Sequence, residues 1–304
     1  MTFCPFLWNS VYIDFRGDVY NCCQMVQKIG NIYTHHLRES INSKEQLRLR
    51  ECSQSGRLKC AKGCSIIADE YKKERSDLHI GYHELERLKF HISEFCNIGC
   101  IMCTQEHANR EVLDIEKACE HIDVAPFSEI AIEGGEPLAI EATRHLFRHM
   151  VNQGKQVNIL TNGLLIDSQW ASRIARHSEY IYISVNAATK ATHEKVNRGS
   201  SFNQVMENIG LLRRQRDKSG SNLRIRGHMT IVPQNLHEIP SFIHRFKELG
   251  FDTIDFGFDG SITHLLDTKP RIRKVISERA RRRYEDSMAK ECINTSVLRL
   301  LELI

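Results

Sequence analysis

The sequence lacks any apolar run approaching the roughly 18 residues that would suggest a membrane span. It also lacks a basic stretch and a small-residue cleavage site near its start, MTFCPFLWNSVYIDF, so we expect no secretory signal. An excess of one charge is missing too, because a formal net charge of +4 over 304 residues is too small to indicate nucleic-acid binding across the whole surface. We therefore expect a cytoplasmic protein with neither a membrane nor a nucleic-acid partner.

Cysteine, by contrast, is abundant and clustered. Of the eleven cysteines, three lie within residues 96–103 and six lie in the first 64 residues: Cys4, Cys22, Cys23, Cys52, Cys60 and Cys64. In a chain without a secretory signal, such clusters are more often ligands of a metal or an iron-sulfur cluster than disulfides.

From about residue 88 onward, short β-rich runs alternate with helical patterns. Several of the helical segments end at a glycine suited to a left-handed cap: Gly154, Gly220 and Gly250. The six predicted strands are 88–92, 129–132, 156–161, 180–185, 223–232 and 252–258. Alternation of this kind indicates the α/β class with a parallel sheet. Six units are fewer than the eight of a closed barrel, so we predict a partial (β/α)6 TIM-like barrel with its active site at the carboxyl ends of the strands.

The amino-terminal segment follows a different pattern. Residues 11–15 and 19–22 alternate like half-buried strands, and Arg16-Gly17-Asp18 supplies the turn of a β-hairpin. A helix is expected near 43–51, and a charged linker helix at 66–86. We predict three parts: a small cluster-binding domain of hairpin and helix (1–75), the barrel (76–262) and a helical extension (263–304).

A CxxxCxxC loop follows the first predicted barrel strand. Its thiols, Cys96, Cys100 and Cys103, can bind three irons of a [4Fe-4S] cluster and leave the fourth iron open for substrate chemistry. The alternatives are a zinc site completed by a ligand from elsewhere, or buried cysteines without a metal.

This loop, at the end of the first strand of a six-unit series, resembles the signature of the radical S-adenosylmethionine (SAM) superfamily over about residues 88–260. A second match is Gly134-Gly135-Glu136-Pro137, which is similar to the GGEP loop of that family. Two glycines allow close approach of the backbone to a ligand, and a glutamate accepts hydrogen bonds from an ammonium group. The resemblance implies SAM as cofactor and reductive formation of a 5'-deoxyadenosyl radical.

The resemblance also implies further SAM contacts. Met102 matches the position that packs on the adenine, and Ser184 and Asn186 stand where relatives carry a Ser-x-Asp motif. Asn162 follows the third strand and either contacts the cofactor or shapes the turn. Arg226 either pairs with the SAM carboxylate or forms an ion pair inside the barrel.

The amino-terminal cysteines resemble those of a SPASM or twitch auxiliary-cluster domain, with Gly17-Asp18-Val19-Tyr20-Asn21-Cys22 as the most telling string. The resemblance implies a second [4Fe-4S] cluster, with Cys23 and Cys52 as reserve ligands and four main ligands: Cys4, Cys22, Cys60 and Cys64. Structural zinc, or no metal, are the alternatives.

Two features remain outside these motifs. Cys119 and Cys292 are either buried packing residues or the hydrogen-atom donor that an epimerase needs. Seven basic residues stud a predicted carboxyl-terminal helix, which is either a solvated face or a site for a phosphate or nucleotide: Arg271, Arg273, Lys274, Arg279, Arg281, Arg282 and Arg283.

We therefore predict a radical SAM oxidoreductase or epimerase that takes its electron from a donor such as a flavodoxin or a ferredoxin. A peptide is the expected substrate, to be oxidised, crosslinked or epimerised. The alternative is an epimerase, dehydrogenase or dehydratase that acts on a sugar, a nucleotide-linked compound or another small molecule. An electron carrier or a zinc-stabilised interaction module shares the cysteines but has no use for Glu136.

Overall fold

A computed structural model of the chain describes residues 3–58, 60, 64 and 75–304. The chain forms two compact units, each built from two stretches of sequence. The first unit comprises Met1–Phe95 and Ala108–Val157, and the second comprises Cys96–His107 and Asn158–Ile304. The CxxxCxxC loop thus belongs to the second unit and the Gly134-Gly135 turn to the first.

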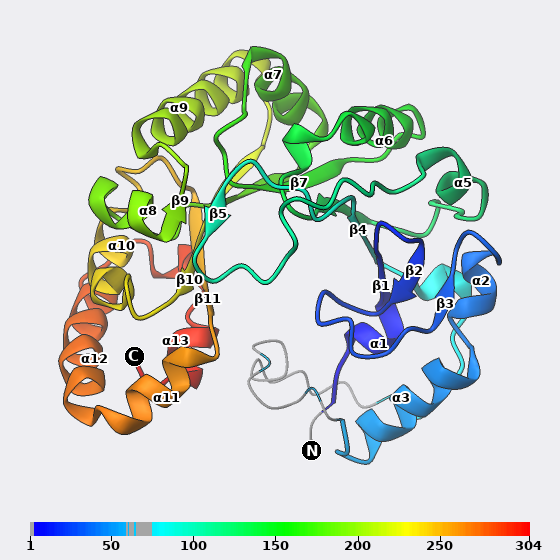
Figure 1. Cartoon of the computed structure of the whole chain (residues 1–304), viewed down its shortest axis with the longest axis horizontal. Coiled ribbons are helices and arrows are strands. Elements are labelled where there is room, and N and C mark those ends of the chain that lie inside the picture. The colour runs from blue at the N-terminus through cyan, green and yellow to red at the C-terminus, as the bar shows by residue number, and fades with distance from the viewer. Residues whose placement is uncertain (1–2, 59, 61–63, 65–74) are drawn as a thin grey trace. The chain divides into compact units, whose positions relative to one another are not determined.

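The sheet of the first unit joins the amino-terminal hairpin to two of the predicted barrel strands (Figure 1). Its strand order is β6-β4-β1-β2-β3, with β1 parallel to β4, β4 parallel to β6, and β2 antiparallel to both β1 and β3. The bounds are β1 (Ser10–Ile13), β2 (Asp18–Tyr20), β3 (Gly30–Asn31), β4 (Arg87–His91) and β6 (Glu129–Glu133). The predicted hairpin is confirmed, and the Asp14 carboxylate closes its turn by accepting from the backbone N–H groups of Arg16 and Asp18.

Short helices complete the first unit. They are α1 (Phe6–Asn9), α2 (Leu37–Ser40), α3 (Lys44–Gln54), α5 (Ile115–Glu120) and α6 (Glu141–Asn152), with the 3₁₀ turns η2 (Tyr82–Glu84) and η3 (Pro137–Ala139). The predicted helix near 43–51 is confirmed as α3, which begins where the Ser43 hydroxyl accepts from Gln46 N–H.

The predicted linker helix lies partly outside the described residues, since 65–74 are not described. Within 75–86 the prediction is wrong, because apart from η2 this stretch is not helical. The backbone of this stretch is instead bound by side chains in and just before α3. Arg50 donates to the Leu78 carbonyl, and Asn42 bonds both the N–H and the C=O of Ile80. These bonds hold the backbone groups that a helix would have paired internally.

The second unit contains a four-stranded parallel sheet of order β11-β10-β8-β7 and a separate two-stranded antiparallel ribbon, β5-β9. The strands are β5 (Gly99–Cys100), β7 (Val157–Thr161), β8 (Tyr180–Ser184), β9 (Asn197–Arg198), β10 (Arg224–Ile231) and β11 (Thr253–Phe258). Its helices are α7 (Ser168–His177), α8 (Lys190–Val196), α9 (Phe202–Ser219), α10 (Ile239–Arg245), α11 (Ser261–Thr268), α12 (Pro270–Glu285) and α13 (Ser296–Leu300), with 3₁₀ turns η4 (Leu236–Glu238) and η5 (Lys290–Cys292).

Strands β10 and β11 have one apolar and one polar face. The apolar face packs under the helices, since the Phe242 ring of α10 contacts Phe256 of β11. Successive side chains of a strand point to opposite faces, so His228 on β10 and its paired neighbour Asp255 on β11 point to the face away from Phe256. The second unit therefore presents a polar sheet face on the side opposite α10.

All six predicted barrel strands are present, and the predicted α/β class with a mostly parallel sheet is confirmed. The glycines predicted to end helical segments adopt positive φ: Gly154, Gly220 and Gly250. Within the described part of the chain, no helix combines the length and apolar character needed to cross a membrane.

Candidate active site

The CxxxCxxC loop is anchored to the segment that follows α8. Gly99 and Cys100 pair with Arg198 and Asn197 in the β5-β9 ribbon, and Ile101 N–H donates to the Val196 carbonyl at 3.0 Å. A tight turn follows, in which Cys103 N–H donates to the Cys100 carbonyl at 3.1 Å. The ribbon fixes the loop at its centre, so the three thiols are carried on a constrained backbone.

One asparagine amide lies beside each of two of these thiols. Asn162, after β7, has its Nδ2 4.0 Å from Cys96 Sγ and donates to Asn97 Oδ1 at 2.8 Å. Cys100 Sγ lies 3.4 Å from Oδ1 of Asn197, a completely buried residue that was not predicted as a site residue. Hydrogen bonds to cluster sulfurs tune the reduction potential, and Asn162 presents an N–H donor toward Cys96 Sγ. Asn197 instead faces Cys100 Sγ with its acceptor oxygen.

The donor set of the loop fits an iron-sulfur cluster. Cys96 and Cys100 are half-buried and Cys103 is exposed, while Met102 beside them is half-buried. No three His, Cys, Asp or Glu side chains in the described part of the chain lie close enough together to hold a single metal ion. Cluster ligands bind different irons, so they lie farther apart than the ligands of one ion.

The Gly134-Gly135-Glu136-Pro137 turn lies in the first unit, directly after β6. Its backbone packs on the segment after β4: Gly135 N–H donates to Ser93 O and Glu136 N–H to Phe95 O, each at 2.8 Å. A Cβ on Gly135 would stand 2.1 Å from Phe95 O, so no other residue fits there without displacing backbone. Glu136 is completely buried, and its Oε1 accepts from Leu138 N–H at the start of η3. The turn is thus preorganised, as a ligand-binding backbone requires.

The other predicted SAM contacts have distinct environments. Ser184 ends β8, and its carbonyl accepts from Asn197 Nδ2 at 3.3 Å. The Asn186 amide is buried and engaged within the protein, since its Nδ2 donates to Asn197 Oδ1 at 2.9 Å and its Oδ1 accepts from Thr230 N–H at 2.8 Å. The Arg226 guanidinium lies 3.9 Å from the Tyr180 ring centre, in the amino-terminal half of β10.

The structure also assembles a polar group that sequence reasoning missed, here called the strand triad: Tyr182 on β8, His228 on β10 and Asp255 on β11. His228 Nδ1 lies 2.5 Å from Asp255 Oδ1, and the Tyr182 hydroxyl donates to Asp255 Oδ2. Burial raises the pKa of Tyr182 well above its usual value, and the Asp255 carboxylate raises it further, so the phenol stays protonated. His228 Nε2 lies 3.1 Å from the Thr230 hydroxyl, closing a connected hydrogen-bond chain.

In the amino-terminal module, the four predicted main ligands lie close enough to influence one another electrostatically. Burial raises the pKa of Cys4 to about 11, with smaller increases from Cys64 and Cys60. Burial likewise raises the pKa of Cys22 to about 11, with increases from Cys4, Cys60 and Cys64. The charged neighbours of Cys23 include Glu133 and Lys89. Four thiols near one another fit an auxiliary cluster, and the neighbours of Cys23 include Cys22 as well as Glu133 and Lys89.

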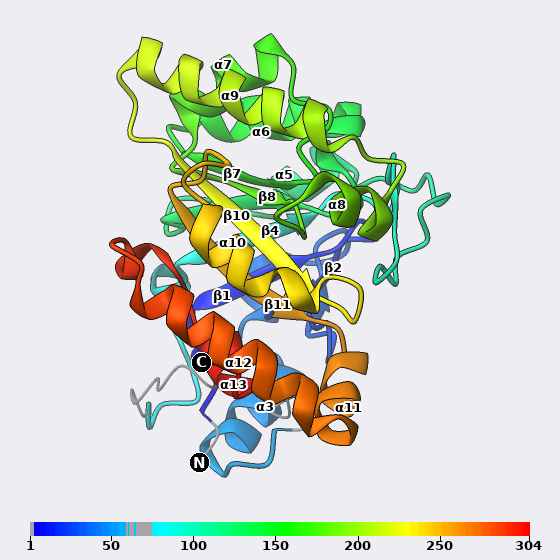
Figure 2. The ribbon, with the colours of Figure 1, turned by 90° about the vertical axis from the view of Figure 1, so that its left-hand side faces the viewer.

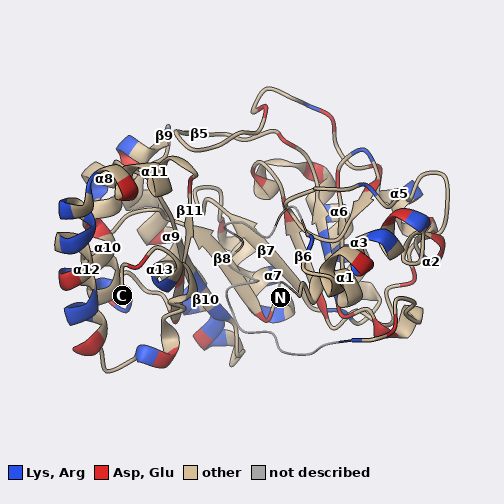
Figure 3. Cartoon of the chain, turned by 90° about the horizontal axis from the view of Figure 1, so that it is seen from below, with Lys and Arg blue, Asp and Glu red and all other residues tan. Residues whose placement is uncertain are grey.

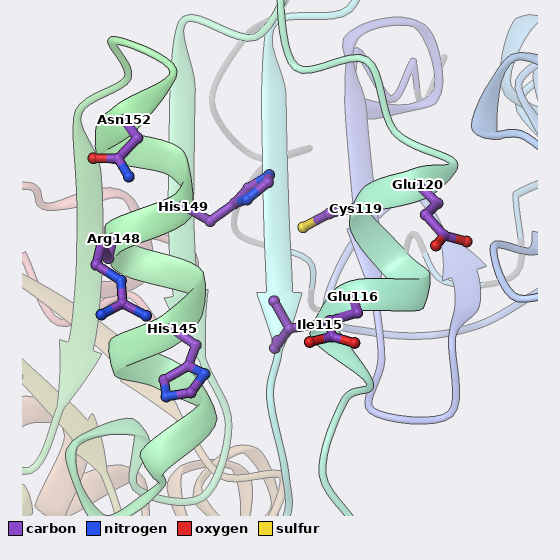
Figure 4. A pocket seen from close by; sticks show the side chains of 8 residues that line it. All are labelled: Ile115, Glu116, Cys119, Glu120, His145, Arg148, His149 and Asn152. Atoms are coloured by element: carbon purple, nitrogen blue, oxygen red, sulfur yellow. The ribbon is translucent and has the colours of Figure 1, made fainter.

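The two unassigned cysteines lie elsewhere. Cys119 on α5 points toward His149 of α6, and both line a cavity of about 420 Å³ between these helices (Figure 4). Burial raises the pKa of Cys119 to about 11. Cys292 Sγ lies 3.7 Å from Lys247 Nζ, which also donates to the carbonyl of Asp252, just before β11 begins. Neither thiol is thus placed at the carboxyl end of a strand.

Comparison with known families decides the identity. The model of the radical SAM superfamily matches residues 90–243, about half of the chain. The chain belongs to the radical SAM superfamily. The model of the SPASM iron-sulfur cluster-binding domain matches residues 4–65, ahead of the radical SAM region as predicted. SAM and [4Fe-4S] clusters are therefore the cofactors of this radical SAM protein.

Individual relatives are distant. A probable GTP 3',8-cyclase of Saccharolobus islandicus is 23% identical over 199 residues, which cover 61% of this chain and 58% of the relative. A cysteine-type anaerobic sulfatase-maturating enzyme of Clostridium novyi is 29% identical over 191 residues, 55% of this chain and 47% of the relative. The chain spans about half the length of these curated relatives.

Among solved structures, SuiB of Streptococcus suis bound to its precursor peptide SuiA matches with a TM-score of 0.50. The sequence identity is 14%, and the match covers 93% of this chain and 71% of SuiB. At this identity the likeness shows a shared fold.

Proposed function

We propose that this radical SAM enzyme oxidises, crosslinks or epimerises a peptide by abstracting hydrogen from an unactivated carbon. The observation that carries the proposal is the constrained loop that bears three cysteines, in a chain that also has an amino-terminal SPASM match. A reduced [4Fe-4S] cluster on such a loop supplies the electron that cleaves SAM to methionine and the 5'-deoxyadenosyl radical.

Specific residues take the binding roles in this proposal. Cys96, Cys100 and Cys103 ligate the catalytic cluster, and Asn162 donates toward the Cys96 sulfur. The turn at Gly134-Gly135, with Glu136 and Pro137, binds the SAM amino group through backbone carbonyls and the glutamate. Met102 packs on the adenine, and Ser184 contacts SAM at the end of β8. The SAM contacts of Asn186 and Arg226 are weaker proposals, because the amide of Asn186 is already bonded within the protein.

The strand triad, in this proposal, holds the substrate. The three side chains bond one another, but the His228 and Asp255 side chains stay 17% and 26% exposed, so a peptide backbone can bond the remaining lone pairs of the carboxylate. Gly257 on β11 lets the His228 ring lie close against the strand, because a Cβ there would lie 3.1 Å from His228 Nε2. A polar sheet face in a parallel sheet is well suited to orient a substrate toward the reacting carbon.

The auxiliary domain completes the proposal. Cys4, Cys22, Cys60 and Cys64 would hold a second [4Fe-4S] cluster, which would serve either as an electron acceptor or as a ligand of the substrate. An external reductant such as a flavodoxin or ferredoxin supplies the first electron. Reduced thiols and clusters suit the cytoplasm. Cys119 and Cys292 remain candidates for a hydrogen-atom donor only if the product is epimerised.

A second candidate function is turnover of a nucleotide or other small molecule. The GTP 3',8-cyclases among the relatives favour it, whereas the sulfatase-maturating enzyme and the peptide-bound SuiB structure favour a peptide. Both candidate functions use the same radical chemistry and differ only in the substrate.

The test is iron, sulfide and 5'-deoxyadenosine on anaerobically reconstituted, reduced protein beside a Cys96/Cys100/Cys103→Ala triple variant. We expect about eight irons per chain with SAM cleavage in the wild type, and about four without cleavage in the variant. Zinc, or iron without deoxyadenosine, would contradict the proposal. Stimulation of cleavage by pooled synthetic peptides, and not by GTP, supports the peptide; the reverse supports the small molecule. Solvent deuterium in an unoxidised product would identify epimerisation.

A further inference from the structure

A pocket in the helical layer of the second unit is lined by basic side chains. It has a volume of about 410 Å³, within the range of small-molecule sites. Helices α10 and α12 pack side by side (Figure 2), and the lining side chains come from these two helices and from η4. The lining residues, here called the basic pocket, are His237, Pro240, Ser241, Arg279, Arg282 and Arg283.

The three arginines occupy one stripe of α12. Arg282 and Arg283 stand three and four residues after Arg279, so the three side chains project from the same side of the helix. Like charges at this spacing repel one another and destabilise a helix. Figure 3 shows the resulting band of basic residues along α12.

The acidic residues near α12 leave this stripe largely uncompensated. Two other cations of the helix are paired, Arg273 with Asp267 and Glu302, and Lys274 with Glu278. Of the pocket arginines in the described structure, only Arg282 has a recorded ion pair, a 3.8 Å contact with Asp286 in which both side chains are exposed. None of the residues that line the described pocket is acidic.

The chemistry of the lining indicates the ligand. A guanidinium presents a planar fork of donors that matches phosphate oxygens, and arginine remains charged at any physiological pH. The imidazole of His237 and the hydroxyl of Ser241 add donors from the opposite wall. The three lining arginines are exposed, so the pocket is open to a ligand from solvent, and its many donors suit a compact anion with many oxygens.

The basic pocket is separate from the proposed substrate site. Phe242 of α10 packs on Phe256 of β11, so α10 covers the sheet face opposite Asp255 and His228. We propose that the basic pocket binds a phosphate-bearing anion, either free pyrophosphate or the phosphates of a nucleotide, at a site distinct from the reaction centre. This ligand site goes beyond the proposed function and does not depend on it.

The experiment is anaerobic isothermal titration calorimetry on the reconstituted protein with sodium pyrophosphate at constant ionic strength. The test variant is Arg279→Gln/Arg283→Gln, and the matched control is Arg271→Gln/Arg281→Gln, which removes two exposed arginines of the same helix outside the pocket. We expect saturable binding by the wild type, a Kd raised at least about tenfold in the test variant, and little change in the control. Titration with GTP distinguishes the sources: tighter binding than pyrophosphate indicates a nucleotide, and equal binding indicates that only the phosphates are bound.

Two results would overturn the proposal. One is the absence of binding of both pyrophosphate and GTP to the wild type. The other is an equal loss of affinity in Arg271→Gln/Arg281→Gln, which would show that the general charge of α12 attracts the anion. Neither result bears on SAM cleavage, so failure of this proposal is distinguishable from failure of the proposed function.

Discussion

Replacing Gly135 by alanine tests whether the turn after β6 is held against the segment after β4 as tightly as the structure indicates. The added Cβ would lie 2.1 Å from Phe95 O and 2.4 Å from Glu94 O, both of them backbone atoms that no side-chain rotation can move. To reach ordinary contact, one of the two segments must move by about an ångström. That shift breaks the hydrogen bonds from Gly135 N–H to Ser93 O and from Glu136 N–H to Phe95 O.

The expected loss of stability combines two contributions. Overpacking costs about 1–3 kcal/mol, and each lost backbone hydrogen bond costs about 0.5–1.5 kcal/mol, which gives roughly 2–6 kcal/mol in all. For a protein of this size, a loss of that order lowers the Tm by roughly 5–20 °C. Because the same turn carries Glu136, we also expect weaker SAM binding.

The assay is differential scanning calorimetry under anaerobic conditions, together with equilibrium dialysis of SAM. Gly260→Ala is the matched control, because a Cβ at Gly260 meets nothing within 4 Å and its φ of −57° suits alanine. The reasoning is refuted if Gly135→Ala melts with the control and binds SAM as the wild type does.

Three further predictions concern buried polar contacts. Asn197→Ala removes the amide beside Cys100 and should lower iron incorporation on reconstitution and change the electron paramagnetic resonance spectrum of the reduced cluster. Tyr182→Phe removes the hydroxyl bonded to the Asp255 carboxylate and should lower the free energy of unfolding by about 1.5–3 kcal/mol, measured by thermal denaturation. Burial lowers the pKa of His91, so the folded state resists its protonation; its contribution to stability is present above about pH 6.5 and is lost as the pH falls below that value. The acid-induced fall in Tm should therefore be smaller in His91→Gln.

Each of these predictions has a contradicting outcome. For Asn197, the comparison is Asn208→Ala, a buried asparagine that bonds the carbonyls of Gly163 and Leu164 instead of a cysteine. Equal spectra in the two variants would show that Asn197 does not influence the cluster. If Tyr182→Phe is as stable as the wild type, the hydrogen bond from the Tyr182 hydroxyl makes no net contribution to the free energy of unfolding. If the Tm of His91→Gln falls with decreasing pH as steeply as the Tm of the wild type, residues other than His91 cause the acid sensitivity.

Much of the fold was accessible from the sequence because its determinants are local. The hairpin turn is specified by Asp14 and by Gly17, whose φ of 77° favours glycine, and both lie inside the predicted turn. The failed helix at 75–86 had the composition of a helix, but Arg50 and Asn42 bind its backbone from 28 and 38 residues away in sequence. Composition cannot report such long-range competition for backbone groups.

Part of the site was accessible for a different reason. A glycine pair and a close cysteine spacing are motifs that remain visible in one dimension, and the structure explains Gly135 by a backbone approach that only glycine allows. The position of Asn186 was also readable, but its hydrogen-bonding capacity was not, because its partners Asn197 and Thr230 come from other segments. A motif thus identifies a position at a strand end without telling which atoms are still available to a cofactor.

The strand triad could have been found from a signal that was present in the sequence. A parallel strand covered on both faces is almost continuously apolar. Strand β10 instead alternates, with Arg226, His228 and Thr230 on one face. Its neighbours β8 and β11 place Tyr182 and Asp255 on the same face, where pairing register brings them beside His228. Period-two polarity in consecutive parallel strands therefore indicates that one face of the sheet lines a polar site, and register, which needs the structure, determines which side chains meet there.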